Sequence, residues 1–180
     1  MEAKRIAVIG PESSGKSWLC QELAGYFGTS WVEEFARGYM ATLTLNPSPA
    51  GREREIRFEE LTLIARRQIL SVEEAVPKAH RYLFCDTDLH NICVWSEYAF
   101  QRCDPWLARA EENQHFDLYL LLKPDIPWIA DGIRQNPHLR EELFARYEAR
   151  LIEKKRPYVI IRGEPKARLH QGIKAIRDFF

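Results

Sequence analysis

Short apolar runs alternate with longer amphipathic stretches along the whole chain. The apolar runs are rich in β-branched and aromatic residues and predict strands at residues 6–9, 29–34, 81–85, 117–122 and 158–161. Apolar residues at helical spacing predict helices over residues 19–27, 35–40, 52–76, 89–98, 105–114, 138–155 and 169–180. Because strands and helices alternate, the pattern predicts an α/β fold with a five-stranded parallel sheet that carries helices on both faces.

The longest predicted helix covers residues 52–76 and is stopped by Pro77. The segment before it, residues 46–51, contains two prolines and a glycine and predicts a loop. The alternating charges at residues 52–55 are interpreted as a solvated face of the helix rather than a binding patch.

The first predicted strand runs directly into Gly10-x-x-x-x-Gly15-Lys16-Ser17, and a predicted helix follows. This is the phosphate-binding loop (P-loop) of nucleoside triphosphate-binding proteins, in the strand–loop–helix context that it requires. The glycines permit tight backbone angles, and the loop N–H groups converge on phosphates at the start of the helix. Lys16 is expected to reach the β- and γ-phosphates of ATP, and the Ser17 hydroxyl to hold Mg²⁺. The predicted nucleotide contacts here are Gly10, Glu12, Ser13, Ser14, Gly15, Lys16, Ser17 and Trp18.

Two aspartates follow the third predicted strand, at the sheet edge where a parallel α/β fold binds its ligands. Asp86 occupies the position of the carboxylate that P-loop proteins associate with Mg²⁺. Asp88, two residues on, is a candidate general base or ligand of a substrate hydroxyl. It is equally a candidate helix N-cap, and both interpretations of Asp88 stay open.

Glu34 and Arg37 follow the second predicted strand at the spacing i and i+3, so one helical turn presents both on one face. In a cleft this pair would suit a small substrate that carries hydroxyl groups and charge. On spacing alone, a surface ion pair of little energetic value is the simpler interpretation.

The segment after the fourth strand, about residues 123–140, contains three prolines and a glycine and predicts a lid over the phosphates. Arg134 is its leading candidate for stabilising transition-state charge and for contacting the nucleotide, with Arg140 next. By analogy with P-loop kinases, the loop of residues 163–168 is expected to hold the adenine, with Arg168 stacking on it.

Composition limits the partners. The chain has 180 residues, which predicts one domain over residues 1–180, and its 26 acidic and 26 basic residues balance. Without a net field, neither nucleic acid nor a membrane is an expected partner. The four cysteines lack metal-ligand spacing, and no leader-like or membrane-spanning segment is evident, so we expect a reduced, cytoplasmic protein. The number of subunits is left open.

Five stretches resemble the ribosylnicotinamide kinase domain of NadR-type NAD biosynthesis proteins and the small P-loop ATPases and kinases related to it. They lie in the same order at residues 10–17, 31–37, 86–88, 116–123 and 128–134. The resemblance implies ATP- and Mg²⁺-dependent phosphorylation of the 5′-hydroxyl of nicotinamide riboside. It also implies that the side chains facing substrate and metal are Glu34, Arg37, Asp86 and Asp88. This sequence differs from the bifunctional proteins, because it has no His-x-Gly-His motif, which their adenylyltransferase domain carries.

Three alternatives were weighed against this kinase. Another small-molecule or nucleoside kinase would share the same motifs. A GTPase-like switch or regulatory nucleotide-binding module would be expected to carry Asn-Lys-x-Asp, whereas residues 122–125 read Leu-Lys-Pro-Asp. A ring-forming mechanical ATPase would be expected to place Glu after Asp86, where this chain has Thr87. The sequence therefore favours a nucleoside kinase with ATP and Mg²⁺ as its cofactors.

Overall fold

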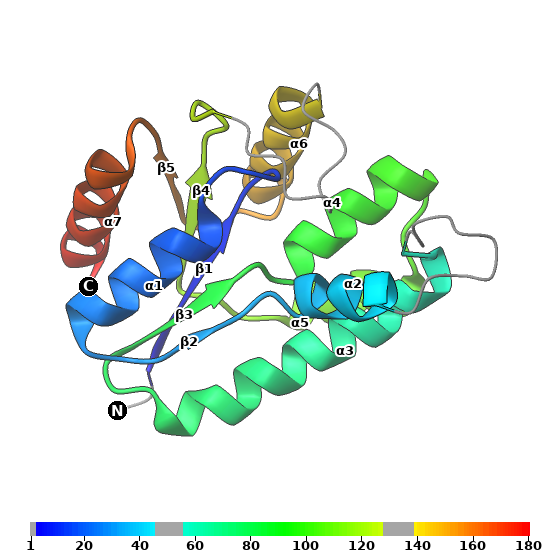
Figure 1. Ribbon diagram of the computed structural model, residues 1–180, viewed down its shortest axis with the longest axis horizontal. Helices are drawn as coiled ribbons and strands as arrows, with labels where there is room; N and C mark the ends of the chain where they lie inside the picture. Colours follow the sequence, from blue (N-terminus) through cyan, green and yellow to red (C-terminus); the bar gives the residue numbers. More distant parts are fainter. Residues whose placement is uncertain (1–2, 46–55, 128–138) are drawn as a thin grey trace.

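The protein is described here from a computed structural model, in which residues 3–45, 56–127 and 139–180 are described. Five parallel strands form one sheet in the order β2-β3-β1-β4-β5 (Figure 1). The strands are β1 (Lys4–Ile9), β2 (Trp31–Val32), β3 (Tyr82–Asp86), β4 (Leu118–Leu122) and β5 (Tyr158–Ile161). The central strands β1, β3 and β4 carry the apolar runs that identify them in the sequence.

Helices connect the strands. They are α1 (Lys16–Phe27), α2 (Phe35–Leu45), α3 (Phe58–Ala75), the 3₁₀ turn η1 (Val76–Lys78), α4 (Leu89–Phe100), α5 (Pro105–Asn113), α6 (Arg140–Glu153) and α7 (Pro165–Phe179). The predicted five-stranded parallel sheet with helices on both faces is therefore confirmed.

Each face of the sheet packs against its own set of helices. Ile6 and Val8 of β1 point to the face covered by α1 and α7, whereas Ala7 and Ile9 point to the face covered by α6 with parts of α3 and α4. This alternation follows from the period of two along a strand. A third cluster joins α3, α4 and α5 beyond the edge of the sheet. Figure 1 shows α1 and α7 on one side and the α2–α5 group on the other.

Several boundaries differ from the sequence-based prediction. Helix α3 begins at Phe58 rather than at residue 52, because Arg57 has an extended backbone and the Glu60 side chain accepts from the Arg57 N–H at 2.8 Å. Strand β2 is two residues long, and α2 continues to Leu45. The predicted loop at residues 46–51 and the charges at residues 52–55 lie outside the described residues.

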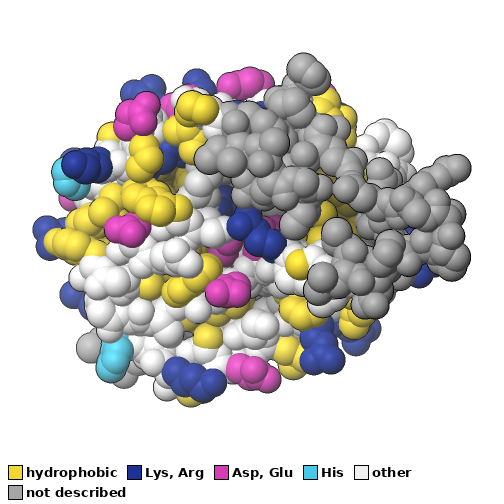
Figure 2. Space-filling view, viewed as in Figure 1, with side chains coloured by type: hydrophobic (Ala, Val, Ile, Leu, Met, Phe, Trp, Pro, Cys, Tyr) yellow, Lys and Arg dark blue, Asp and Glu magenta, His cyan; other side chains and the backbone are white. Residues whose placement is uncertain are grey.

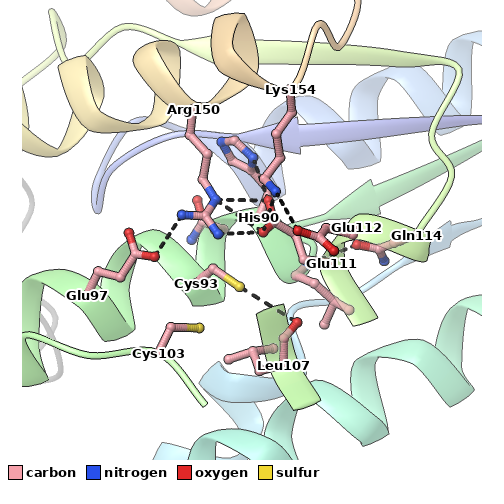
Figure 3. A network of polar contacts seen from close by, with 12 residues as sticks. His90, Cys93, Glu97, Cys103, Leu107, Glu111, Glu112, Gln114, Arg150 and Lys154 are labelled. Atoms are coloured by element: carbon pink, nitrogen blue, oxygen red, sulfur yellow. Dashed lines mark hydrogen bonds and ion pairs between the residues drawn. The ribbon is translucent and has the colours of Figure 1, made fainter. Parts of the chain in front are cut away.

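A buried polar network ties α4, α5 and α6 together (Figure 3). Glu111 of α5 is fully buried and accepts hydrogen bonds from Arg150 of α6, at 2.6 Å from Nη2 and 3.0 Å from Nε. His90 of α4 places Nδ1 3.3 Å from Glu111 and Nε2 3.1 Å from the Tyr147 carbonyl. Burial alone would raise the pKa of Glu111, but the hydrogen bonds from His90 and Arg150 outweigh it and lower this pKa to about 2. This network fixes the helix that follows Asp86.

Among the described residues, all four cysteines are free thiols. The helices within the described ranges include none that is both long and apolar enough to cross a membrane.

Candidate active site

The loop between β1 and α1 has the backbone geometry of a phosphate cradle. Gly15 is the N-cap of α1 with φ of 84°, and Gly10 has φ of 145°. A Cβ on Gly10 would lie 2.8 Å from the carbonyl oxygen of Leu122 in β4, so only glycine allows the loop to pass this close to the neighbouring strand. The free N–H groups at the start of α1 therefore face the open end of the loop, where an anion is favoured.

Lys16 lies across this loop. Its ammonium donates to the carbonyls of Gly10 at 3.1 Å and Pro11 at 3.2 Å, and the residue is only 8% exposed. A lysine held here places its charge at the mouth of the cradle, where phosphate oxygens would compete with the two carbonyls for its protons. The structure thus brings Lys16 to the place that the P-loop pattern predicts.

Asp86 ends β3 beside the strand that leads into the loop, since its register partner in β1 is Val8. Burial is the main cause that raises its pKa to about 6, and the nearby charge of Glu34 acts in the same direction. The charge of Lys16, a hydrogen bond with Ser17 and the charge of Arg37 oppose this rise. The aspartate is therefore close to the P-loop and to both residues of the predicted substrate pair.

Asp86 and Ser17 fit a magnesium ion. Within the described ranges, the buried Oδ1 of Asp86 has no hydrogen-bond partner, which leaves an oxygen available to a cation. Mg²⁺ takes oxygen ligands and usually binds one or two protein groups while phosphates and water complete its shell. The described residues contain no group of three or more His, Cys, Asp or Glu side chains that could hold a metal ion.

Glu34 and Arg37 form the predicted ion pair, with Arg37 Nε 3.9 Å from Glu34 Oε2. The side chains are 20% and 45% exposed respectively, and both act on the pKa of Asp86. The pair therefore stands beside the P-loop rather than on a remote surface. Figure 2 shows acidic and basic side chains close together near the middle of one face of the molecule.

Asp88 has a different environment from Asp86. It is the N-cap of α4, where Oδ1 accepts from the Asn91 N–H at 3.2 Å, and it is completely buried. Burial raises its pKa, while the charges of His90 and Arg156 and the Asn91 hydrogen bond oppose the rise. The structure shows the N-cap through Oδ1, while Oδ2 has no hydrogen-bond partner within the described ranges, so the role of Asp88 as a base or substrate ligand stays a prediction.

Arg168 corrects a prediction. Its side chain is 1% exposed, and its guanidinium donates to the carbonyls of Gly163 at 2.6 Å, Ser14 at 3.0 Å and Lys123 at 2.8 Å, and to the Asp125 carboxylate. The prediction that Arg168 stacks on adenine is wrong, because a guanidinium with this burial and these acceptors presents no free face. It instead fastens the back of the P-loop.

Other predicted positions are placed as follows. Trp18 is half-buried and packs on the cluster formed by α1 and α7, and Glu12 is half-buried in the loop. Ser13 and Ser14 are buried within the loop. Arg134, with residues 128–138 of the predicted lid, lies outside the described residues, so its role stays a prediction.

Sequence reasoning missed Gln68 of α3. It is 1% exposed, its Oε1 accepts from the Phe35 N–H at 2.9 Å, and its Nε2 donates to the Glu33 carbonyl at 3.4 Å. It therefore holds the β2–α2 turn that presents Glu34. The only available signal was a polar residue on the inner stripe of a helix, which by itself does not identify a partner 33 residues away.

The family comparison covers nearly the whole chain. A family model described as an AAA domain matches residues 5–168. The trifunctional NAD biosynthesis/regulator proteins NadR of Salmonella typhimurium and Escherichia coli are each 30% identical to this chain over 131 residues. This match covers 73% of this chain but only 31% of each relative.

The comparison with solved structures also finds NadR proteins. A crystal structure of NadR protein in complex with NR has a TM-score of 0.82 and 24% identity, covering 98% of this chain and 51% of that one. NadR in complex with NAD and AMP-PNP has a TM-score of 0.78 and 22% identity, with 98% and 49% covered. A deoxyadenosine kinase from M. mycoides has a TM-score of 0.65 and 13% identity, with 97% and 99% covered. At these identities the structures show a shared fold.

Proposed function

We propose that this chain, which belongs to the AAA domain family, is a kinase that transfers the γ-phosphoryl group of ATP to a nucleoside, with nicotinamide riboside as the acceptor. One observation carries the proposal. Lys16, Ser17 and Asp86 lie together at the P-loop, and the Glu34–Arg37 pair lies beside them at the same edge of the sheet. The 30% identity to NadR proteins supports nicotinamide riboside over other nucleosides.

The protein's own groups would act by positioning and by charge. The loop N–H groups and the Lys16 ammonium would bind the β- and γ-phosphates and offset the charge that develops on the transferring group. Ser17 and Asp86 would hold Mg²⁺. Held there, the ion would supply positive charge that offsets the charge of the phosphates. Asp86 performs this role as a carboxylate, which its raised pKa of about 6 still permits at neutral pH.

The acceptor would lie against α2. The Glu34 carboxylate is suited to accept hydrogen bonds from ribose hydroxyls, and Arg37 holds it in place. Asp86 and Asp88 are both buried, and each has one carboxylate oxygen without a hydrogen-bond partner within the described ranges, so the attacking hydroxyl would be oriented by Glu34 together with one of these two aspartates. Arg134 remains the proposed source of additional positive charge at the phosphates.

A second candidate is a kinase of a different nucleoside. The fold shared with a deoxyadenosine kinase over 97% of this chain favours it, because that fold serves more than one acceptor. The P-loop chemistry would be the same in both candidates, and only the groups that contact the acceptor would differ.

Release of ADP from Mg·ATP, measured with purified protein and a panel of nucleosides, separates these candidates. The proposal predicts the greatest stimulation by nicotinamide riboside, and Glu34→Gln should raise the KM for the acceptor while the KM for ATP stays the same. Greater stimulation by a deoxynucleoside would favour the second candidate. If no nucleoside stimulates ADP release although ATP binds, the kinase proposal fails and a regulatory nucleotide-binding module takes its place.

A further inference from the structure

Two buried arginines donate hydrogen bonds to consecutive carbonyl groups of the P-loop. Arg140, the first residue of α6, donates from Nη2 to the Ser13 carbonyl at 3.2 Å, and from Nη1 and Nη2 to the Ile126 carbonyl at 3.0 and 3.1 Å. Arg168 of α7 donates to the next carbonyl, that of Ser14, at 3.0 Å. The two residues are 9% and 1% exposed, so both guanidinium groups lie behind the loop.

The planar peptide bond gives these contacts a consequence on the opposite side of the loop. In a trans peptide, the carbonyl of one residue and the N–H of the next point in opposite directions. The structure contains no cis peptide bond among its described residues. Holding the Ser13 and Ser14 carbonyls at the back therefore directs the N–H groups of Ser14 and Gly15 to the front, where the P-loop binds phosphate.

The loop also needs such support. Ser13 has φ of 53°, a left-handed conformation that costs a non-glycine residue of order 1 kcal/mol. Hydrogen bonds from charged donors are about twice as strong as neutral ones, so the guanidinium groups can hold this conformation before any ligand binds. They also polarise the two peptides, which makes their N–H groups better donors to an anion.

The same arginines join the loop to the end of β4. Arg168 donates to the Lys123 carbonyl and to the Asp125 carboxylate, which in turn accepts from the Gly163 N–H at 2.9 Å. The Ile126 side chain also approaches the loop, since a Cβ built on Gly15 would lie 3.5 Å from it. The P-loop is thus fastened from two helices and one strand end.

We propose that Arg140 and Arg168 are positioning residues that pre-form the phosphate cradle by holding the Ser13 and Ser14 carbonyls from behind. The inference rests on the proposed function, because it takes this cradle to be the site of a nucleotide's phosphates. It assigns neither arginine to the adenine nor to the transferring phosphoryl group.

Binding of Mg·ADP and Mg·pyrophosphate, measured by calorimetry, tests this assignment. Arg140→Gln and Arg168→Gln should each weaken the binding of both ligands by about the same factor. This factor should be roughly 10- to 100-fold, which is the range expected for the loss of charged hydrogen bonds. Arg146→Gln and Arg177→Gln are the matched controls on the same two helices. Their guanidinium groups are on the surface, with Glu142 and Tyr26 as their respective partners, so both should bind as wild type does.

The alternative roles give different results. If either arginine contacted the adenine, its substitution would weaken the binding of ADP and leave the binding of pyrophosphate unchanged. If it stabilised the transition state, its substitution would lower kcat while both ligands bind normally. Either outcome overturns the inference, as does wild-type binding by both variants. If the Gln variants do not fold, Arg140→Lys and Arg168→Lys decide by the same comparison, because they keep the buried charge but lose the fork of donors. Absence of binding by the wild-type protein would instead refute the proposed function.

Discussion

Replacing Asp86 by Asn should stabilise the metal-free protein while abolishing phosphoryl transfer. Burial and the charge of Glu34 raise the pKa of this aspartate from 3.8 to about 6, which means that the fold penalises the charged form. The side chain is retained for its ability to hold a cation rather than for stability. Asn keeps the shape and can still accept from Ser17, but it carries no charge.

The size of the expected stabilisation follows from the size of the pKa shift of Asp86. A pKa change of one unit corresponds to about 1.4 kcal/mol, so a rise from 3.8 to about 6 corresponds to roughly 3 kcal/mol at neutral pH. For a chain of this length, about 3 kcal/mol raises Tm by roughly 6–12 °C. The shift to about 6 already includes the opposing attraction of Lys16 and Arg37, so this figure is the net penalty of the charged form.

The direction in which stability changes with pH follows from the raised pKa of Asp86. Because the folded pKa lies above the unfolded one, the native state binds the proton more tightly, and wild-type stability falls as pH rises from about 4 to 6. The difference between Asp86→Asn and wild type should therefore be largest above about pH 6 and should nearly vanish by about pH 4. Carboxyl groups remote from Asp86 titrate alike in both proteins and cancel in the difference.

Urea unfolding in EDTA, at several pH values, measures this difference. Asp178→Asn is the matched control, because Asp178 is 62% exposed and pairs with Lys174 on the surface of α7. It should change the free energy of unfolding by less than about 0.5 kcal/mol. A destabilised Asp86→Asn protein, or a gain that does not depend on pH, would refute the reasoning about this site.

Three other substitutions test the site and its support. Lys16→Ala should lower kcat by about 10³-fold or more with the fold intact by circular dichroism, and near-normal turnover would remove Lys16 from the mechanism. Gly10→Ala should destabilise the protein by about 2 kcal/mol or more in urea, because its Cβ would lie 2.8 Å from the Leu122 carbonyl, whereas Gly25→Ala has open space and should gain up to about 1 kcal/mol. Glu111→Gln should cost about 3 kcal/mol, because it removes the buried carboxylate that Arg150 and His90 share, although Arg150 keeps its ion pair with Glu97, and equal stability would show that the network in Figure 3 is dispensable.

The acid limb of the activity profile adds a further test. Because Asp86 must be ionised to hold Mg²⁺ and its pKa is raised to about 6, kcat/KM should fall as pH decreases through about 6. Initial rates between about pH 5 and 8 at Mg²⁺ concentrations below saturation, where the proton and the metal ion compete for Asp86, would reveal this limb. A rate that stays constant down to about pH 5 would argue against Asp86 as the metal-associated group.

The parts of the site that were predictable from sequence are those encoded by contiguous residues. The P-loop spacing specifies a backbone shape, so Gly10 and Lys16 could be placed without knowing their neighbours. Asp86 followed from its place at the end of an apolar strand, because carboxyl ends of parallel strands share one edge of the sheet.

The parts that were not predictable depend on distant neighbours. Arg168 lies on α7, although residues 163–168 were expected to form a loop, and only the fold brings it to a carbonyl 154 residues away. Gln68 reaches the β2–α2 turn from the middle of α3 in the same way. Asp88 fitted both a base and an N-cap locally; the structure shows the N-cap, and the second role stays a prediction.

The most direct test of the central claim is transfer of labelled phosphate from γ-labelled Mg·ATP to nicotinamide riboside, followed by mass analysis of the product. The account predicts a phosphomonoester with the mass of nicotinamide mononucleotide in reactions with wild-type protein, and no such product with Lys16→Ala. Label that appears only as inorganic phosphate, or transfer that Lys16→Ala performs at the wild-type rate, would contradict it.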